Sequence, residues 1–316
     1  MRISALLLAV LGVLPLVAQG PGGVFIAVGE GGRRMSSPDG RRWENDTCWA
    51  AGAADADEAL HDVAFGLGRF IAVGGGAAKG RILATRDGQA WRELPAPRGR
   101  VGTIVFGGGR FIAGHGGELL WSADGEKFVA GEKLDWPGTA RALRAAWGDG
   151  EGGHRCVILG DLDPGGAQPR VSWRASTADG ARYTSHDRGT RPACDVAYGA
   201  GHWVVVGPDG LIESSLDGQN WQPRTAGPGE DFQRVAWTGT RFLVSGGKAA
   251  WSSPDGVNWT KAAAPIPGRL AWARERVLGI GFSPGGNIHV STDLAAWRKL
   301  PGPPGPPLRA VAFGTP

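Results

Sequence analysis

The sequence has few of the residue types that several classes of site require. Its 316 residues include only three cysteines, two tyrosines and six histidines. Cys48, Cys156 and Cys194 form no C-x-x-C pair and have no spacing typical of a zinc site. The histidines likewise show no spacing typical of metal ligands. We therefore expect neither a metal ion nor a cofactor.

Long apolar runs and blocks of one charge are also scarce. Beyond the first 18 residues, no stretch is apolar enough to cross a bilayer. The formal net charge is only +4, and no five successive residues carry charge of one sign. Nucleic-acid binding favours a basic stripe interleaved with exposed aromatic residues, and we find none. We therefore expect no nucleic-acid partner.

Residues 1–18 have the order of a secretory signal peptide. Arg2 precedes an apolar run from Ile3 to Ala18, and small or polar residues follow that run. The alternative is a membrane anchor, but the run is shorter than the about 20 residues needed and contains Pro15. We expect cleavage near residues 18–20 and export to the periplasm or the cell exterior.

Export bears on the cysteines, because a disulfide persists in an oxidising compartment. Cys156 and Cys194 are the preferred pair, which would leave Cys48 as a free thiol. The equally weighted alternative is that all three cysteines are small, buried hydrophobic residues.

Glycine is abundant instead. The 55 glycines are far above the usual share of about 7%. They follow no G-X-Y period, which excludes a collagen-like chain. Because each interior glycine weakens a helix by about 1 kcal/mol, this usage favours an all-β protein with many turns.

One unit recurs seven times along the chain. Its best copy reads V-A-F-G at 63–66, R-F-I-A-V-G at 69–74 and T-R-D-G at 85–88, followed by Trp91. Each copy predicts four short strands, with the S/T-x-D-G turn between the third and the fourth. We expect the turn carboxylates to accept backbone N–H bonds. The turn aspartates are Asp39, Asp87, Asp124, Asp179, Asp217, Asp255 and Asp293.

The two ends of the chain predict how the units are arranged. The first copy begins at residues 25–29 and lacks a V-A-aromatic-G strand, which occurs instead at 311–314. Strands such as 70–73 are apolar on both faces, so each must be covered on both sides. We predict a single all-β domain over residues 24–314. It would be a seven-bladed β-propeller of four-stranded antiparallel blades, closed by the C-terminal strand completing blade 1.

The S/T-x-D-G-x-x-W element resembles the Asp-box of BNR repeats. Propellers with such repeats include sialidases, sortilin-type receptors and photosystem II assembly factors. The full unit is most similar to exported bacterial propellers grouped with the assembly-factor type, and the resemblance covers residues 24–314. It implies that the turn aspartates are structural and lie opposite the ligand face. Two departures are the adjacency of Asp and Gly and the presence of Leu294 where glycine is expected.

The resemblance also allows sialidase activity to be assessed, because sialidases use a tyrosine nucleophile. Tyr183 takes the aromatic position after the fourth turn, and Tyr198 takes the aromatic position of V-A-Y-G. Both tyrosines therefore have structural positions, which disfavours a sialidase. A hydrolase using two carboxylates, or a lectin, remains the alternative to a non-catalytic module.

Candidate binding residues lie in the connections expected at one face of the ring. Trp49, Trp136 and Trp173 fall in irregular insertions, where an exposed indole can bind a partner or sugar, or can pin its own loop. Polar candidates on the same face are Glu30, Arg34, Arg81, His115, Glu118, Asp161 and Asp209. We expect a monomeric, non-catalytic binding or assembly module that recognises a protein, a glycan or another polar ligand.

Overall fold

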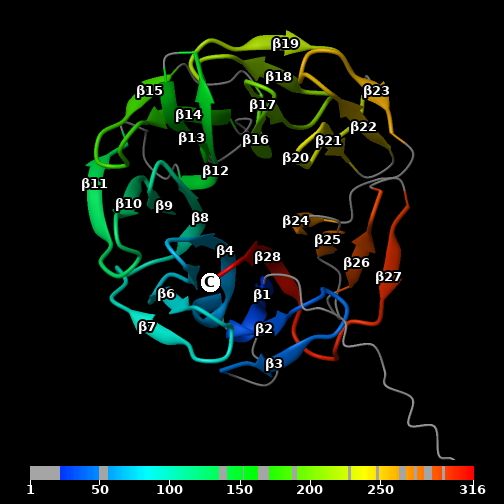
Figure 1. Ribbon diagram of the computed structural model, residues 1–316. Helices are drawn as coiled ribbons and strands as arrows, with labels where there is room; N and C mark the ends of the chain where they lie inside the picture. The colour runs from blue at the N-terminus through cyan, green and yellow to red at the C-terminus, as the bar shows by residue number, and fades with distance from the viewer. Residues whose placement is uncertain are drawn as a thin grey trace, which may run out of the picture.

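Seven four-stranded antiparallel sheets surround a common centre (Figure 1). This computed structural model describes residues 22–49, 56–134, 141–151, 153–162, 171–186, 191–226, 229–246, 249–262, 268–273, 276–280, 287–293 and 296–316. No helix in these segments is long and apolar enough to cross a membrane.

The innermost strand of each sheet comes first in the following order, and the outermost comes last. The sheets are β28 (Leu308–Gly314), β1 (Val24–Gly29), β2 (Arg34–Ser37), β3 (Glu44–Thr47); β4 (Leu60–Gly66), β5 (Arg69–Gly75), β6 (Gly80–Thr85), β7 (Arg92–Leu94); β8 (Val101–Gly107), β9 (Arg110–His115), β10 (Glu118–Ser122), β11 (Val129–Lys133); β12 (Arg141–Gly150), β13 (Gly153–Leu162), β14 (Val171–Thr177), β15 (Thr184–His186); β16 (Asp195–Gly199), β17 (His202–Val206), β18 (Ile212–Ser215), β19 (Gln222–Arg224); β20 (Arg234–Trp237), β21 (Phe242–Ser245), β22 (Ala250–Ser253), β23 (Thr260–Lys261); and β24 (Arg269–Ala273), β25 (Arg276–Ile280), β26 (Ile288–Ser291), β27 (Arg298–Leu300).

The C-terminal strand β28 belongs to the same sheet as the N-terminal strand β1. Their antiparallel register aligns Phe25 with Phe313 and Ala27 with Val311. Leu308 and Ala310 of β28 are fully buried between neighbouring sheets. The two ends of the described chain are therefore joined through one sheet.

Alternating side chains explain why strands without polar residues are stable here. In β5, Ile71 and Val73 pack in the cluster shared with the β8–β11 sheet, whereas Phe70 and Ala72 pack toward β1 and β28. Successive residues of a strand point to opposite faces, so each sheet contributes to two interfaces. Six apolar clusters of this kind join neighbouring sheets.

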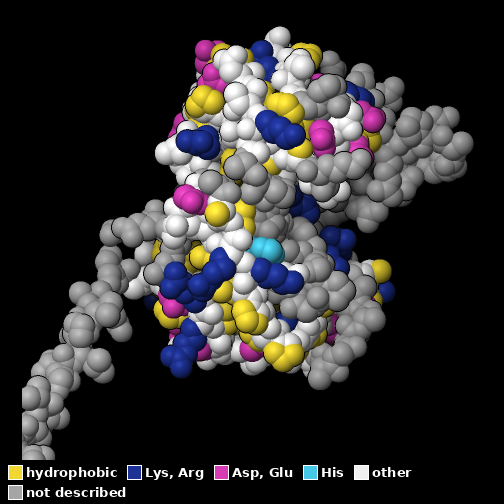
Figure 2. Space-filling model, turned by 90° about the vertical axis from the view of Figure 1, so that its right-hand side faces the viewer, with side chains coloured by type: hydrophobic (Ala, Val, Ile, Leu, Met, Phe, Trp, Pro, Cys, Tyr) yellow, Lys and Arg dark blue, Asp and Glu magenta, His cyan; other side chains and the backbone are white. Residues whose placement is uncertain are grey.

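In the described part of the chain, no such cluster joins the β20–β23 sheet to the β24–β27 sheet. Figure 2 shows the surface indented on this side of the molecule. At the junction between the β4–β7 and β8–β11 sheets, the phenyl group of Phe106 packs on Gly66. Any Cβ at position 66 would collide with this phenyl group. Thr238 stands at the corresponding position after β20.

The six S/T-x-D-G turns share one hydrogen-bond pattern, and the seventh turn, which has Leu294 in place of glycine, retains the aspartate. Asp217 Oδ1 accepts the N–H groups of Gln219 and Asn220, each at 2.8 Å. Ser215 Oγ accepts the N–H of Gly218 at 2.8 Å, and Gly218 has a φ of +70°. The remaining six aspartates accept backbone N–H bonds in their own turns. The turn carboxylates are thus engaged with the backbone.

These hydrogen bonds predict sensitivity to acid. Bonds from the backbone of Lys127 and Glu126 lower the pKa of Asp124 to about 2. In the unfolded chain this carboxylate titrates near about 4, so the unfolded state takes up a proton first as the pH falls. The stability that the charged form contributes is complete above pH about 4 and is lost as the pH approaches about 2. Urea unfolding at pH 7, 4 and 3 measures this loss.

The variant Asp124→Asn isolates the contribution of one turn, because its amide oxygen still accepts hydrogen bonds but does not titrate. We expect its free energy of unfolding to fall less steeply between pH 4 and 3 than that of the wild type. An unchanged slope would show that the turn carboxylate contributes nothing to the pH dependence.

Candidate functional site

Strand direction divides the connections between two faces of the molecule. Connections from the second to the third strand, and from the fourth strand to the next sheet, emerge at one face, which we call the loop face. The S/T-x-D-G turns lie at the opposite face. The described candidates from the sequence all lie at loop-face ends of strands: Glu30, Arg34, Trp49, Trp173, Arg81, His115, Glu118 and Asp209. They form separate groups rather than one site.

Trp49 packs with two of the other candidates, Arg34 and Arg81. Its indole lies between the guanidinium groups of Arg34, 5.1 Å from the ring centroid, and Arg81, at 4.3 Å. Arg81 is 8% exposed and is paired with Glu58 and Glu93. The backbone N–H of Trp49 donates to the carbonyl of Gly31 at 3.0 Å. These contacts favour the alternative in which this tryptophan pins its own loop.

His115 and Asp209 each contact a neighbouring connection at the loop face. His115 Nε2 lies 2.9 Å from the carbonyl of Arg98, and Glu118 lies 3.8 Å from Lys133. The Asp209 N–H donates to Asp231 at 3.1 Å. Neither group gathers several functional side chains around a recess.

The structure corrects the expectation for Trp173. It lies in strand β14, opposite Gly160 of β13, and its half-buried indole packs against the cluster of Cys156 and Ile158. The two strands extend into what the sequence predicted as an irregular insertion. Asp161 belongs to β13, but its side chain lies outside the described residues, as does all of Trp136.

A polar recess that the sequence did not predict lies where the inner strands begin. We call it the channel mouth: Arg100, Arg144, Arg234, Arg269 and Arg309 with Glu30, His61, Asp62 and Asp195. Two cavities of about 360 and 350 Å³ share Arg144, Arg234 and Arg269. Glu30 follows β1 and Arg100 precedes β8, and the other residues lie on β4, β12, β16, β20, β24 and β28, which Figure 1 shows arranged around the centre. Of the predicted candidates whose side chains the structure describes, only Glu30 contributes.

The carboxylates of the channel mouth tie neighbouring sheets together. Asp62 accepts hydrogen bonds from Thr103 Oγ1 at 2.8 Å and from the Ile104 N–H at 3.1 Å, and is paired with Arg269. Asp195 accepts the Val235 N–H at 3.1 Å and lies 3.5 Å from Arg144 Nε. Glu30 is paired with Arg309. All three acids are therefore occupied by partners in this chain.

The arginines of the channel mouth lower one another's pKa. Burial and the nearby charge of Arg269 lower the pKa of Arg144 to about 9, although Asp195 acts in the opposite sense. Burial also lowers the pKa of Arg234, and Arg269 adds to this effect against Asp195. The pKa of His61 falls to about 4 through burial and the charge of Arg100. His61 is thus neutral at pH 7, and the positive charge of the recess comes from guanidinium groups.

This arrangement suits binding better than acid–base chemistry. A general acid must hold a proton to donate, whereas Asp62 and Asp195 accept bonds from backbone N–H groups and pair with arginines. The two tyrosine hydroxyls donate to the carbonyls of Lys133 and Asp149. Within the described segments, no three His, Cys, Asp or Glu side chains form a group that could hold a metal ion.

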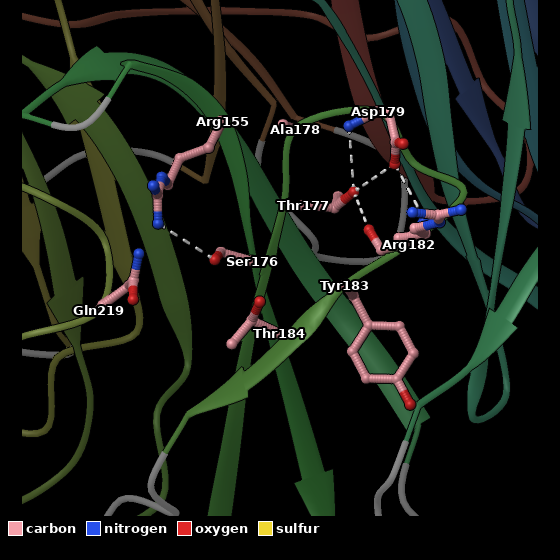
Figure 3. A pocket seen from close by; sticks show the side chains of 9 residues that line it. All are labelled: Arg155, Ser176, Thr177, Ala178, Asp179, Arg182, Tyr183, Thr184 and Gln219. Carbon is pink, nitrogen blue, oxygen red and sulfur yellow. Dashed lines mark hydrogen bonds between the residues drawn. The ribbon is translucent and has the colours of Figure 1, made fainter.

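A third cavity, of about 250 Å³, lies by the turn of Asp179 (Figure 3). Arg155 and Gln219 point toward one another across it, while the Tyr183 ring projects away. Thr177 Oγ1 accepts the Gly180 N–H at 2.7 Å, and Asp179 accepts the Ala181 N–H at 2.9 Å. Its polar groups mainly serve the turn, so we regard it as structural.

The predicted Cys156–Cys194 disulfide is not formed, because all three cysteines are free. Cys156 points into the cluster between the β8–β11 and β12–β15 sheets, whereas Cys194 precedes β16 in the next sheet. The alternative of three buried thiols is wrong for Cys48, which is exposed.

Thiol labelling should separate these positions. We expect a maleimide to modify Cys48 in the folded protein at pH 7 and to modify Cys156 only after unfolding, since burial shields the latter and raises its pKa. Peptide mass spectrometry measures both. Labelling of Cys156 at the same rate in folded and urea-unfolded protein would contradict its position.

Comparison with known proteins identifies the fold alone. No family model and no curated protein matches the sequence. The WD40 β-propeller domain of Doa1 is 14% identical with a TM-score of 0.51, over 90% of each chain. Apo AztD from Citrobacter koseri is 11% identical with a TM-score of 0.52, over 92% of this chain and 97% of AztD. Saccharomyces cerevisiae Sqt1 is 10% identical with a TM-score of 0.51, over 78% and 75%. The chain is therefore similar in fold to β-propellers.

Proposed function

We propose that this protein is an exported, monomeric, non-catalytic binding or assembly module that recognises a polar ligand or a protein through its loop face. The observation that carries the proposal is the channel mouth. Its cavities of about 350–360 Å³ lie within the size range of ligand sites, and guanidinium groups line them. Similar folds include WD40 propellers, a class often used for binding.

The finer features of the proposal have support from both the sequence and the structure. Seven repeats and the β28–β1 pairing support a seven-bladed ring that closes fully in solution. The S/T-x-D-G turns, with their shared hydrogen bonds, support membership of the Asp-box repeat propellers. Residues 1–18 support export through a signal peptide.

Charge reversal on opposite faces tests the binding face. Lys79→Glu with Lys133→Glu alters exposed loop-face side chains, whereas Arg86→Glu with Lys127→Glu makes a matched change at the turn face. Each protein is immobilised, incubated with envelope extract of the producing cell, and compared by quantitative mass spectrometry. We expect only the loop-face variant to lose its captured partner. Equal capture by both variants would contradict the proposal.

A carbohydrate-active hydrolase or lectin is the second candidate. The observation in its favour is that Asp62 and Asp195 line the same cavity. Hydrolysis of aryl glycosides by the wild type that is lost in Asp195→Asn would favour the hydrolase. Retention on a glycan column without turnover would favour the lectin.

A further inference from the structure

We propose that the central channel binds a small amphiphilic carboxylate, with its head group at Arg269 in the channel mouth and its apolar chain deeper in the channel. This inference deepens the proposed function and rests on it in one respect, namely that the loop face is the binding face. It adds the chemistry of the ligand and the direction in which the ligand lies.

The inner strands change from polar to apolar in one direction. Six of them carry a polar or charged residue near the loop-face end, then two apolar residues, then an aromatic residue. The polar residues are Asp62, Thr103, Arg144, Asp195, Arg234 and Arg269. Polar and apolar members of this pattern line the same cavity. The channel is therefore polar at the loop face and apolar further in.

The apolar part of this cavity, which we call the channel wall, is supplied by strands β8, β12, β16, β20 and β24. Its residues are Val105, Ala145, Ala197, Tyr198, Ala236, Trp237 and Leu270. All of them are only half-buried, although they belong to the innermost strands. Apolar surface in contact with water is unfavourable, and an apolar chain in the cavity would cover it. The cavity volume of about 350 Å³ lies within the range of small-molecule sites.

Arg269 supplies hydrogen-bond donors at the polar end. It lines both cavities of the channel mouth, and its side chain is 17% exposed. Its Nη1 pairs with Asp62, and its other N–H groups have no acceptor among the described residues. A guanidinium group presents five donors in a planar fork that matches the two oxygens of a carboxylate. A carboxylate head group therefore fits this end of the cavity.

The deeper part of the channel wall is ordered by contacts between sheets. The ring of Tyr198 packs on Gly148 of the preceding sheet, and its hydroxyl donates to the carbonyl of Asp149. The ring of Trp237 packs on Gly199 in the same way. Because these side chains are already fixed, a ligand would lose little binding energy in ordering them.

The binding test uses the full-length mature protein and calorimetric titration below the critical micelle concentration of each probe. The probes are butanoate, hexanoate and octanoate, with octyltrimethylammonium as a control that has the same chain as octanoate and a cationic head group. We expect one-to-one binding that tightens about fourfold with each added CH₂ group. Octyltrimethylammonium should bind about tenfold more weakly than octanoate or worse, because a guanidinium group has no acceptor.

Two variants separate the head group from the chain. Arg269→Gln should weaken binding of every carboxylate about tenfold and leave the gain per CH₂ group unchanged. Ala236→Leu fills part of the channel, so it should weaken binding of octanoate about tenfold and that of butanoate much less. Ala123→Leu is the matched control at the turn face, where Leu216 occupies the equivalent position of another turn, and should change neither affinity. A smaller folded fraction would lower all affinities alike, so it cannot produce this difference.

Three results would overturn the inference. One is an affinity that does not depend on chain length, and another is equal binding of octanoate and octyltrimethylammonium. The third is binding that neither Arg269→Gln nor Ala236→Leu changes. If the partner captured through Lys79 and Lys133 persists in any of these cases, the proposed function stands without this ligand, and if that capture also fails, both are wrong.

Discussion

Deleting residues 308–316 should abolish the folded state. The deletion removes β28, which pairs with β1 and buries Leu308, Ala310 and Val311 in two interfaces. Each buried aliphatic side chain contributes on the order of 1.5–3 kcal/mol, and the paired backbone of β1 would be exposed as well. The total loss is comparable to the about 5–15 kcal/mol that stabilises a typical domain. Circular dichroism should show no cooperative thermal transition.

Two controls separate loss of the strand from loss of the terminus. Deleting only Thr315 and Pro316 should leave the melting temperature unchanged, because both residues lie beyond β28 and are exposed. A synthetic peptide of residues 306–316 should restore a cooperative transition to the truncated chain. A truncated chain that melts at the wild-type temperature would show that β28 is dispensable.

The second large effect is expected at Arg33. Its side chain is 1% exposed and donates to both oxygens of Asp46, at 3.0 and 2.8 Å. It also donates to the carbonyls of Pro303, at 2.9 Å, and Pro306, at 2.7 Å. The guanidinium group therefore holds the proline-rich connector, residues 301–307, which leads into β28. We expect Arg33→Met to lower the free energy of unfolding by about 3 kcal/mol, because Asp46 and the two carbonyls lose the buried guanidinium group that donates to them.

A matched variant in the same sheet tests whether the loss is specific to the buried site. Arg42 is 82% exposed and lies 3.6 Å from Glu44. Arg42→Met should change the free energy of unfolding by less than about 0.5 kcal/mol. Urea unfolding measures both variants, and equal effects at the two positions would contradict the role assigned to Arg33.

The repeat predicted the sheets but not the channel mouth. The number of strands per sheet, the S/T-x-D-G turns and the position of residues 311–314 follow from local patterns that recur along one chain. The channel mouth depends on residues such as Asp62, Arg144 and Arg234, which are far apart in sequence and meet only because their strands surround one centre. One sequence feature could have identified them. Each of these charged residues immediately precedes the apolar residues that begin the V-A-aromatic-G motif of an inner strand.

Other expectations failed for physical reasons that single residues show. The sequence could not reveal that Arg33 is buried, because that depends on the connector folding back over it. The sequence spacing of Cys156 and Cys194 could not show that Cys156 belongs to the β12–β15 sheet, whereas Cys194 precedes the β16–β19 sheet.

Diffraction from crystals soaked in selenate tests most directly that the channel mouth is the binding site. Selenium gives an anomalous signal, so the position of the dianion is found without assuming a site. We expect an anomalous peak within hydrogen-bonding distance of the guanidinium groups of Arg144, Arg234 or Arg269, and none in the Arg234→Gln variant. Selenate peaks confined to other surfaces, with only water among these arginines, would contradict the assignment.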